Sequence, residues 1–343
     1  MSIDNILQII LITYNRKKHL QKTFEQIFAS NSPIRNYPIT ILDNASTDGT
    51  SELIQEYCKN FPNITHIKHK RNIGGNANIA RAFESASKEY LWILCDDDFY
   101  NWDNWNELEQ AILSNNYDML FTCTQLIRDK KDISQLTHQA TFIPGVIYAS
   151  KRITDDIMQN IHNTINTMFC QTMLSTDIIC NTPEKIFVPN KDIVLRIPNG
   201  EEEDKTVIRG RIESTVHPDT KNVFWHIGFI QAIQVINDKK KRDYIVEHTR
   251  FTDIFTQSFF SYMVFIVEYN HLNKKGNLKN IANLFFNINF TQKITLIFAF
   301  LTYHLIYRFI YFYKTSSGIY VRLFNKLKTK IFSFKRTKQN HTT

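Results

Sequence analysis

Apolar residues in the first 125 positions alternate between short continuous runs and helical spacing. The run 6–12 is broken only by Gln8, as expected for a strand that is covered on both faces. Residues 17–29 instead place apolar side chains three and four positions apart, which predicts a helix. The same reasoning predicts strands over 39–42, 64–67, 90–95 and 119–126, helices over 76–87 and 108–113, and a capped helix start at 48–51. This alternation predicts an α/β fold with a mainly parallel, doubly wound sheet.

Polar clusters follow three of the predicted strands directly. In a doubly wound sheet, ligands bind beyond the carboxyl ends of the strands, where these clusters would meet. The clusters are Thr13-Tyr14-Asn15-Arg16, Asp43-Asn44 and Asp96-Asp97-Asp98. The sequence therefore predicts a nucleotide site at this edge.

The three aspartates Asp96, Asp97 and Asp98 come directly after a run that should be buried. Adjacent carboxylates repel one another unless a cation neutralises them. Their hard oxygen atoms suit Mg²⁺ or Mn²⁺, and a diphosphate would complete the coordination shell. A solvated acidic turn is the alternative, and the position after a buried strand favours the metal.

The second part of the chain has a weaker pattern. Residues 167–179 are predicted to hold a strand and a short helix, and 189–219 a long loop or hairpin. The strongly apolar stretch 222–236 is predicted to form a helix.

The C-terminal end of the chain carries most of the positive charge. The net charge is +8, and 13 Lys and Arg but no Asp or Glu follow Glu268, so residues 1–268 carry about −5 (8 minus 13). The apolar stretch 294–313 contains Arg308, which makes a membrane span costly. Aromatic, apolar surface beside a basic tail is typical of an interfacial anchor on anionic lipid. A nucleic-acid partner is less favoured because no nucleic-acid motif is present, and a solvated tail is the remaining alternative.

Cysteine usage and the N-terminus bear on the compartment. The five cysteines include no Cys-x-x-Cys pair, which argues against a disulfide framework or a zinc site. The N-terminal apolar run lacks a basic region before it and is too short for a signal peptide. We therefore expect a cytoplasmic protein attached peripherally to the inner face of the cell membrane.

Ordered motifs in the first third of the chain resemble the family 2 glycosyltransferases, which have the GT-A fold. These motifs are Leu11-Ile-Thr-Tyr-Asn-Arg16, Ile41-Leu-Asp-Asn-Ala-Ser-Thr-Asp-Gly-Thr50, Arg71-Asn-Ile-Gly-Gly-Asn-Ala-Asn78 and Tyr90-Leu-Trp-Ile-Leu-Cys-Asp-Asp-Asp98. Within that family the chain looks most like bacterial surface-polysaccharide transferases, including the abequosyltransferase-like group. The resemblance implies an inverting, metal-dependent transferase that uses a nucleotide-diphosphate sugar through a DXD motif. UDP is the commonest nucleotide in the family, and GDP, CDP and dTDP stay open.

The resemblance also implies roles for single residues. Tyr14 would lie beside the base, Asp43 would hydrogen-bond the base or ribose, and Asp98 would bind the metal with help from Asp96. The nucleotide-sugar site as a whole would comprise Thr13, Tyr14, Asn15, Arg16, Asp43, Arg71, Asn72, Gly74, Asp96 and Asp97. Each has a structural alternative, such as a core position for Tyr14 or a surface cation for Arg71.

An inverting transferase needs a base that deprotonates the acceptor hydroxyl. Family members usually carry this carboxylate about 100 residues after the aspartates, and Glu202, Glu203 and Asp204 lie at that distance. A solvated acidic face is the alternative. Trp225 could instead stack on a sugar, and His226 could bind the metal or the diphosphate; a buried core histidine is the plainer interpretation.

The combined prediction is a GT-A domain over 1–240, with a nucleotide-binding half (1–125) and an acceptor-binding half (126–240). A helical, basic region over 241–343 would associate with the membrane. The expected reaction moves a sugar to a glycan or lipid-linked acceptor in lipopolysaccharide, lipooligosaccharide or capsule synthesis. The alternative is a non-catalytic nucleotide-sugar-binding protein or a nucleotidyltransferase. The latter is disfavoured because the loop after the first strand has no glycine.

Overall fold

The structure is a computed structural model. It describes residues 2–165, 169–195, 229 and 232–248, together with 294, 297, 298, 301, 302 and 305. The candidate base residues Glu202, Glu203 and Asp204, and the pair Trp225-His226, lie outside the described residues.

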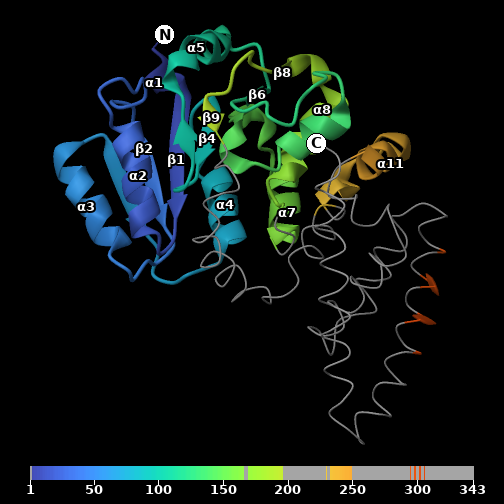
Figure 1. The fold of residues 1–343 in the computed structure, drawn as a ribbon, viewed down its shortest axis with the longest axis horizontal. Helices are drawn as coiled ribbons and strands as arrows, with labels where there is room; N and C mark the ends of the chain where they lie inside the picture. The colour runs from blue at the N-terminus through green and yellow to red at the C-terminus, as the bar shows by residue number, and fades with distance from the viewer. Residues whose placement is uncertain are drawn as a thin grey trace, which may run out of the picture.

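One mixed sheet of seven strands organises the described part of the chain, in the order β3-β2-β1-β4-β7-β6-β8 (Figure 1). Every strand runs parallel to its neighbour except β7, which is antiparallel to both β4 and β6. The strands are β1 (Leu7–Thr13), β2 (Ile39–Asp43), β3 (Ile64–Lys68), β4 (Tyr90–Leu94), β6 (Met119–Phe121), β7 (Val146–Ala149) and β8 (Ile186–Phe187). The α/β architecture with a mostly parallel sheet, predicted from the alternation of periods, is confirmed.

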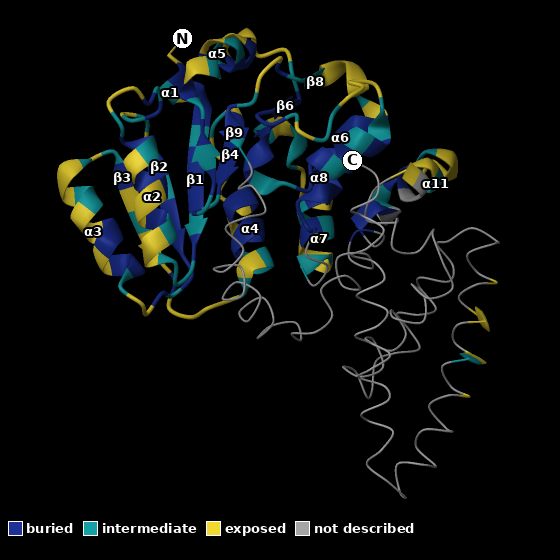
Figure 2. Ribbon diagram, viewed as in Figure 1, coloured by how far each residue is buried: buried dark blue, intermediate teal, exposed yellow. Residues whose placement is uncertain are grey.

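Helices cover both faces of this sheet because successive strand residues point to opposite sides. Ile9 and Leu11 of β1 belong to the core under one set of helices, whereas Ile10 belongs to the core on the other face. Figure 2 shows the buried strands between helices whose outer faces are exposed. The first face carries α2 (Lys17–Ile27), α3 (Thr50–Asn60) and α5 (Trp105–Ser114), and the second carries α4 (Gly75–Glu84), α7 (Asp155–Asn163) and α8 (Thr172–Asn181).

Shorter elements complete the described chain. The remaining α-helices are α1 (Ile3–Ile6), α6 (Ile133–Gln139) and α11 (Lys239–His248). The 3-10 helices are η1 (Trp102–Asn104), η2 (Ile143–Gly145), η3 (Ser150–Arg152), η5 (Pro183–Lys185) and η7 (Ile233–Val235). Across these described residues, no helix is both long enough and apolar enough to cross a membrane.

Two sequence-based expectations fail in the middle of the chain, and one strand there was not expected. The strand expected over 119–126 stops at Phe121. No strand forms in the described part of 167–179, because the helix α8 begins at Thr172 and continues to Asn181. The antiparallel strand β7 was not foreseen. Its four residues are all buried, so they show no alternation of apolar and polar positions from which a strand could be inferred.

A second, two-stranded sheet pairs β5 (Phe99–Tyr100) with β9 (Val194–Leu195). Phe99 faces Leu195 and Tyr100 faces Val194 in antiparallel register. Because β5 follows Asp98 directly, this pairing fixes the chain at 195 beside the end of the aspartate cluster. The predicted loop or hairpin over 189–219 therefore contains the short strand β9, which lies beside the site.

Candidate functional site

The predicted polar clusters meet at the carboxyl edge of the parallel strands. Leu11 of β1 pairs with Leu94 of β4, so the residues two positions further along, Thr13 and Asp96, also come together. The Thr13 hydroxyl donates to Oδ2 of Asp96 over 2.6 Å, and both side chains are buried. The hydrogen bond joins the first predicted cluster to the third.

Arg16 lies at the N-terminal end of α2 and reaches over the aspartates. Its Nε is 3.2 Å from Oδ1 of Asp96, and a terminal guanidinium nitrogen is 2.9 Å from Oδ2 of Asp97. Burial alone lowers the pKa of Arg16, but the charges of Asp96 and Asp97 outweigh it and raise the pKa above its ordinary value. Arg16 is therefore a fixed positive charge at the centre of the site.

Asp96 is held in an environment that disfavours its charge. Burial raises its pKa to about 6, and Asp97 adds to the rise, while Arg16 and the Thr13 hydroxyl oppose it. A buried carboxylate with a raised pKa is typical of functional sites, because a folded protein keeps such a group against an energetic cost. Asp96 thus fits the predicted ligand-binding role better than the alternative of a solvated acidic turn.

Gln26 of α2 is a site residue that the sequence interpretation missed. Its Oε1 accepts from the Tyr100 backbone N–H at 3.0 Å, and its Nε2 donates to the Asp98 carbonyl at 3.3 Å. The Trp102 indole N–H also donates to the Gln26 carbonyl at 3.1 Å. Gln26 therefore ties α2 to the backbone that follows the aspartates. A lone glutamine in an amphipathic helix gives no signal from which this contact could have been found.

Asp43 occupies a closed hydrogen-bonded position at the end of β2. Its carboxylate is fully buried and accepts from the Ser46 backbone N–H at 2.8 Å and from the Ser51 hydroxyl. His66 Nε2 lies 3.5 Å from Oδ2, the oxygen that also accepts from Ser51. Burial acts to raise the pKa of Asp43, but the contact with His66 and the hydrogen bonds from Ser46 and Ser51 together hold it well below its ordinary value.

Two asparagines connect the loops after the first three strands. The Asn15 side chain accepts from the Thr47 backbone N–H at 2.6 Å, which links the loops after β1 and β2. The Asn44 side chain donates to Oδ1 of Asn72 at 2.8 Å and accepts from the Ile73 N–H at 3.0 Å, which links the loops after β2 and β3. These contacts form one continuous polar rim.

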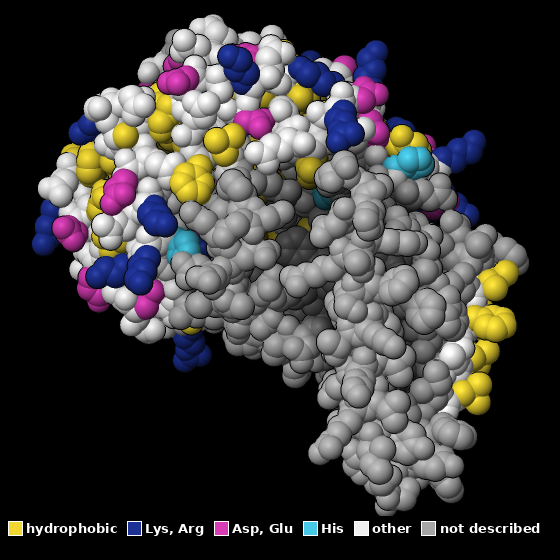
Figure 3. Space-filling view, in the orientation of Figure 1, with side chains coloured by type: hydrophobic (Ala, Val, Ile, Leu, Met, Phe, Trp, Pro, Cys, Tyr) yellow, Lys and Arg dark blue, Asp and Glu magenta, His cyan; other side chains and the backbone are white. Residues whose placement is uncertain are grey.

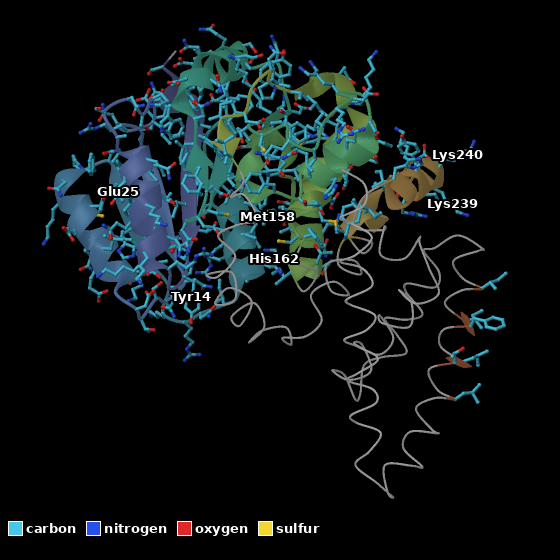
Figure 4. All side chains as sticks on the ribbon, in the orientation of Figure 1. Tyr14, Glu25, Met158, His162, Lys239 and Lys240 are labelled. Carbon is cyan, nitrogen blue, oxygen red and sulfur yellow. The ribbon has the colours of Figure 1, made fainter. Side chains whose placement is uncertain are left out.

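Gly74 ends this rim with a backbone conformation that needs glycine. Its φ of 89° and ψ of 154° are far from the conformations of residues with a side chain. Tyr14 is partly exposed along the same edge, so it does not take its structural alternative of a core position. Arg71 is exposed there, which is also compatible with its alternative of a surface cation. Figure 4 labels Tyr14 at the carboxyl end of the sheet, where β1 ends.

The aspartate carboxylates can hold a divalent ion only if a bound diphosphate supplies further oxygen ligands. Among the residues that the structure describes, no three His, Cys, Asp or Glu side chains converge on one point. The Asp96 and Asp98 side chains are nevertheless buried carboxylates, separated by one residue in the sequence, after the end of β4. Such oxygens fit Mg²⁺ or Mn²⁺ when diphosphate oxygens supply the remaining ligands. Each of the five cysteines is a thiol rather than half of a disulfide, as expected.

Comparison with known protein families and sequences gives matches in the same part of the chain. The model described as glycosyl transferase family 2 matches residues 8–178. The abequosyltransferase RfbV of Salmonella typhimurium is 34% identical over 95 residues, which are 27% of this chain and 28% of that protein. A dolichyl N-acetyl-alpha-D-glucosaminyl phosphate glucuronosyltransferase of Methanococcus voltae is 39% identical over 83 residues, 23% of this chain and 26% of that protein. The chain thus spans about a quarter of the length of these curated relatives.

Solved structures match over a longer stretch but at low identity. S. aureus TarS 1-349, crystallised in complex with UDP-GlcNAc, has a TM-score of 0.50 and 15% identity. The match covers 88% of this chain and 91% of that one. Similarity at this level shows a shared fold, and it agrees with the mostly parallel α/β architecture expected for GT-A.

Proposed function

Because the chain belongs to glycosyl transferase family 2, we propose that it transfers a sugar from a nucleotide-diphosphate sugar to a glycan or lipid-linked acceptor in cell-surface polysaccharide synthesis. The observation that carries this proposal is the meeting of Thr13, Arg16 and Asp96 at the carboxyl edge of the sheet. The similarity to an abequosyltransferase supports the surface-polysaccharide setting.

The polar rim from Asn15 to Gly74 would hold the nucleoside. Tyr14 and Arg71 are accessible there, so they can contact a base. The Asp43 carboxylate already accepts hydrogen bonds from the protein, and its contribution would be to fix the loop on which the nucleoside rests. A UDP-sugar is our first choice of donor, and the TarS complex with UDP-GlcNAc supports it by fold alone.

The diphosphate would lie over the aspartates, with Asp98 and Asp96 holding Mn²⁺ or Mg²⁺. Such an ion, when bound, stabilises the negative charge that develops on the departing nucleoside diphosphate. Arg16 can contact the same phosphate oxygens, because its guanidinium already lies against Asp96 and Asp97. Gln26 would keep the Asp98 backbone in place while the ligand binds.

The base that activates the acceptor is proposed among Glu202, Glu203 and Asp204. Leu195 of β9 is anchored opposite Phe99, directly after the aspartate cluster. Glu202 follows Leu195 by seven residues, and an extended chain of that length reaches about 23 Å, enough to return to the site. Deprotonation by one of these carboxylates would let the acceptor oxygen attack the anomeric carbon opposite the diphosphate, which inverts its configuration. Trp225 and His226 stay secondary candidates for sugar and diphosphate contacts.

A thermal-shift screen of nucleoside diphosphates and their sugars, with and without Mn²⁺, tests the donor site. We expect one nucleotide series to stabilise the protein, and Mn²⁺ to increase the shift, since a ligand that binds only the folded state raises its stability. Asp98→Ala should abolish the Mn²⁺-dependent part and lower transfer about a thousandfold or more. Asp103→Ala, an exposed aspartate in η1, is the matched control. If Asp98→Ala keeps both the Mn²⁺-dependent thermal shift and sugar transfer, the proposed site is wrong.

We also propose that the C-terminal region attaches the protein to the inner face of the cell membrane. Between residues 294 and 305, five of the six described residues are exposed apolar side chains at helical spacing, visible as a yellow edge in Figure 3. They are Ile294, Ile297, Phe298, Leu301 and Leu305. Lys239 and Lys240 of α11 project away from the sheet in Figure 4, so basic groups are also available for anionic headgroups.

Flotation of the full chain with vesicles of defined charge tests the attachment. Vesicles with anionic lipid should carry the protein and neutral vesicles should carry less, with binding that weakens as salt is added. Phe298→Gln should reduce binding, whereas Leu113→Gln, on the exposed surface of α5, should not. Binding to DNA instead of anionic vesicles would contradict this proposal.

A further inference from the structure

Arg16 forms ion pairs with two of the three aspartates, Asp96 and Asp97. It engages Asp96 through Nε at 3.2 Å and Asp97 through a terminal nitrogen at 2.9 Å. Its backbone N–H donates to the Thr50 hydroxyl at 3.0 Å, which fixes the start of α2 over the site. Only 16% of the Arg16 side chain is exposed, so water screens these ion pairs poorly.

A divalent ion approaching these aspartates meets a cation that is already bound. Its two positive charges are repelled by the guanidinium, and the carboxylate oxygens that face Arg16 are not fully available to it. A diphosphate changes this balance, because its oxygens offer Arg16 a bidentate partner and give the ion additional hard ligands. The two ligands should therefore help each other to bind.

We infer that Arg16 competes with the divalent ion for the aspartates and so suppresses metal binding in the absence of nucleotide. When a nucleoside diphosphate binds, its oxygens pair with the Arg16 guanidinium and this competition ends. This inference rests on the proposed donor site and adds an order to it: the ion binds weakly alone and strongly with the diphosphate. Arg16 would then contact the phosphates, as a residue that sets the coupling between the two ligands. Coupling of this kind is reciprocal, so Mn²⁺ must strengthen nucleotide binding by the same factor.

Direct measurement of Mn²⁺ binding separates this role from a structural one. We would titrate the full chain with Mn²⁺ and follow the free ion by electron paramagnetic resonance, first alone and then with saturating UDP. Arg16→Gln removes the charge but keeps a polar side chain. Arg16→Lys keeps the charge but loses the planar fork that contacts two aspartates at once. Arg35→Gln, a cation stacked on Phe61 before β2 at the opposite edge of the sheet, is the matched control.

Without nucleotide, Arg16→Gln should bind Mn²⁺ about tenfold more tightly than the wild type, because a unit charge within about 4 Å of the ligands is removed. Arg16→Lys should lie between the two proteins, and Arg35→Gln should match the wild type. With UDP present, the advantage of Arg16→Gln should disappear. The factor by which UDP strengthens Mn²⁺ binding should fall by the same tenfold.

Equal or weaker Mn²⁺ binding by Arg16→Gln without nucleotide, in a variant with wild-type thermal stability, would overturn the inference and leave the donor site intact. If Arg16→Gln melts earlier, Arg16→Lys carries the test, since its affinity for Mn²⁺ must still exceed that of the wild type. If the wild type binds no Mn²⁺ even with UDP or the other nucleoside diphosphates, the proposed metal site fails and the inference fails with it.

Discussion

Two aspartates lie at the same edge of the sheet and have opposite environments. Asp43 ends β2, and its contact with His66 together with hydrogen bonds from Ser46 and Ser51 holds its pKa below the ordinary range against the effect of burial. Asp96 follows β4, and burial beside Asp97 raises its pKa to about 6 despite Arg16. The negative charge of Asp43 is stabilised by groups of the protein. The negative charge of Asp96 is disfavoured by burial and by Asp97, and a bound cation would stabilise it.

The difference shows that position at the carboxyl edge does not by itself assign a role. A carboxylate whose hydrogen bonds come from the loop and helix that follow its strand stabilises that segment, since a buried, satisfied charge is costly to remove. A carboxylate that is crowded by others gains from an added cation. The same residue type thus builds the rim at one strand and the binding site two strands away.

The largest expected effect comes from neutralising Asp43. Asp43→Asn keeps the size of the side chain but weakens charge-assisted bonds and presents an N–H group to existing donors. We expect the free energy of unfolding to fall by about 2–3 kcal/mol. Urea denaturation at pH 7 measures this change. A loss below about 0.5 kcal/mol would mean that Asp43 is not the fixed point of its loop.

Asp96→Asn should show the opposite pattern, with little effect on stability and a large effect on nucleotide binding. The substitution removes a disfavoured charge while an amide oxygen can still accept from Thr13, so the free energy of unfolding should change by less than about 1 kcal/mol. Mn²⁺-dependent binding of the nucleotide should be lost. Calorimetric titration with nucleotide and Mn²⁺ checks the second part, and destabilisation as large as that of Asp43→Asn would erase the contrast.

The pH dependence of stability provides a third test, centred on Asp43. Its folded-state pKa is depressed below the unfolded value of about 3.9, so its stabilising contribution is complete above that value. The contribution declines as pH falls below about 4 towards the folded-state pKa. The difference in unfolding free energy between the wild type and Asp43→Asn should therefore shrink from pH 5 to pH 3. A constant difference across this window would contradict the assignment.

The smallest expected effect concerns the support behind the aspartates. Gln26→Met keeps the volume of the side chain but removes its contacts with the Tyr100 N–H and the Asp98 carbonyl. We expect the free energy of unfolding to fall by about 1 kcal/mol, and Mn²⁺-dependent nucleotide affinity to fall several-fold. Gln21→Met on the exposed face of the same helix is the control. If both variants bind alike, Gln26 supports only the fold.

Much of the first half could be predicted because its signals are local. The runs at 6–12 and 90–95 correspond to β1 (Leu7–Thr13) and β4 (Tyr90–Leu94) to within one residue at each end. The middle was less predictable because β7 and the β5–β9 pair consist of two to four residues, too few to establish a period. Their existence depends on partners far away in the sequence.

The sequence by itself determined the alternation of strands and helices, and with it the edge at which Thr13, Asp43 and Asp96 gather, because side-chain periodicity and strand direction are local properties. Only the tertiary structure decided what each residue does there. Three contacts join separate elements: the hydrogen bond from Ser51 to Asp43, the ion pairs of Arg16, and the hydrogen bond from Gln26 to the Asp98 carbonyl. Such contacts arise from packing two faces of a sheet, and residue order alone does not encode their distances.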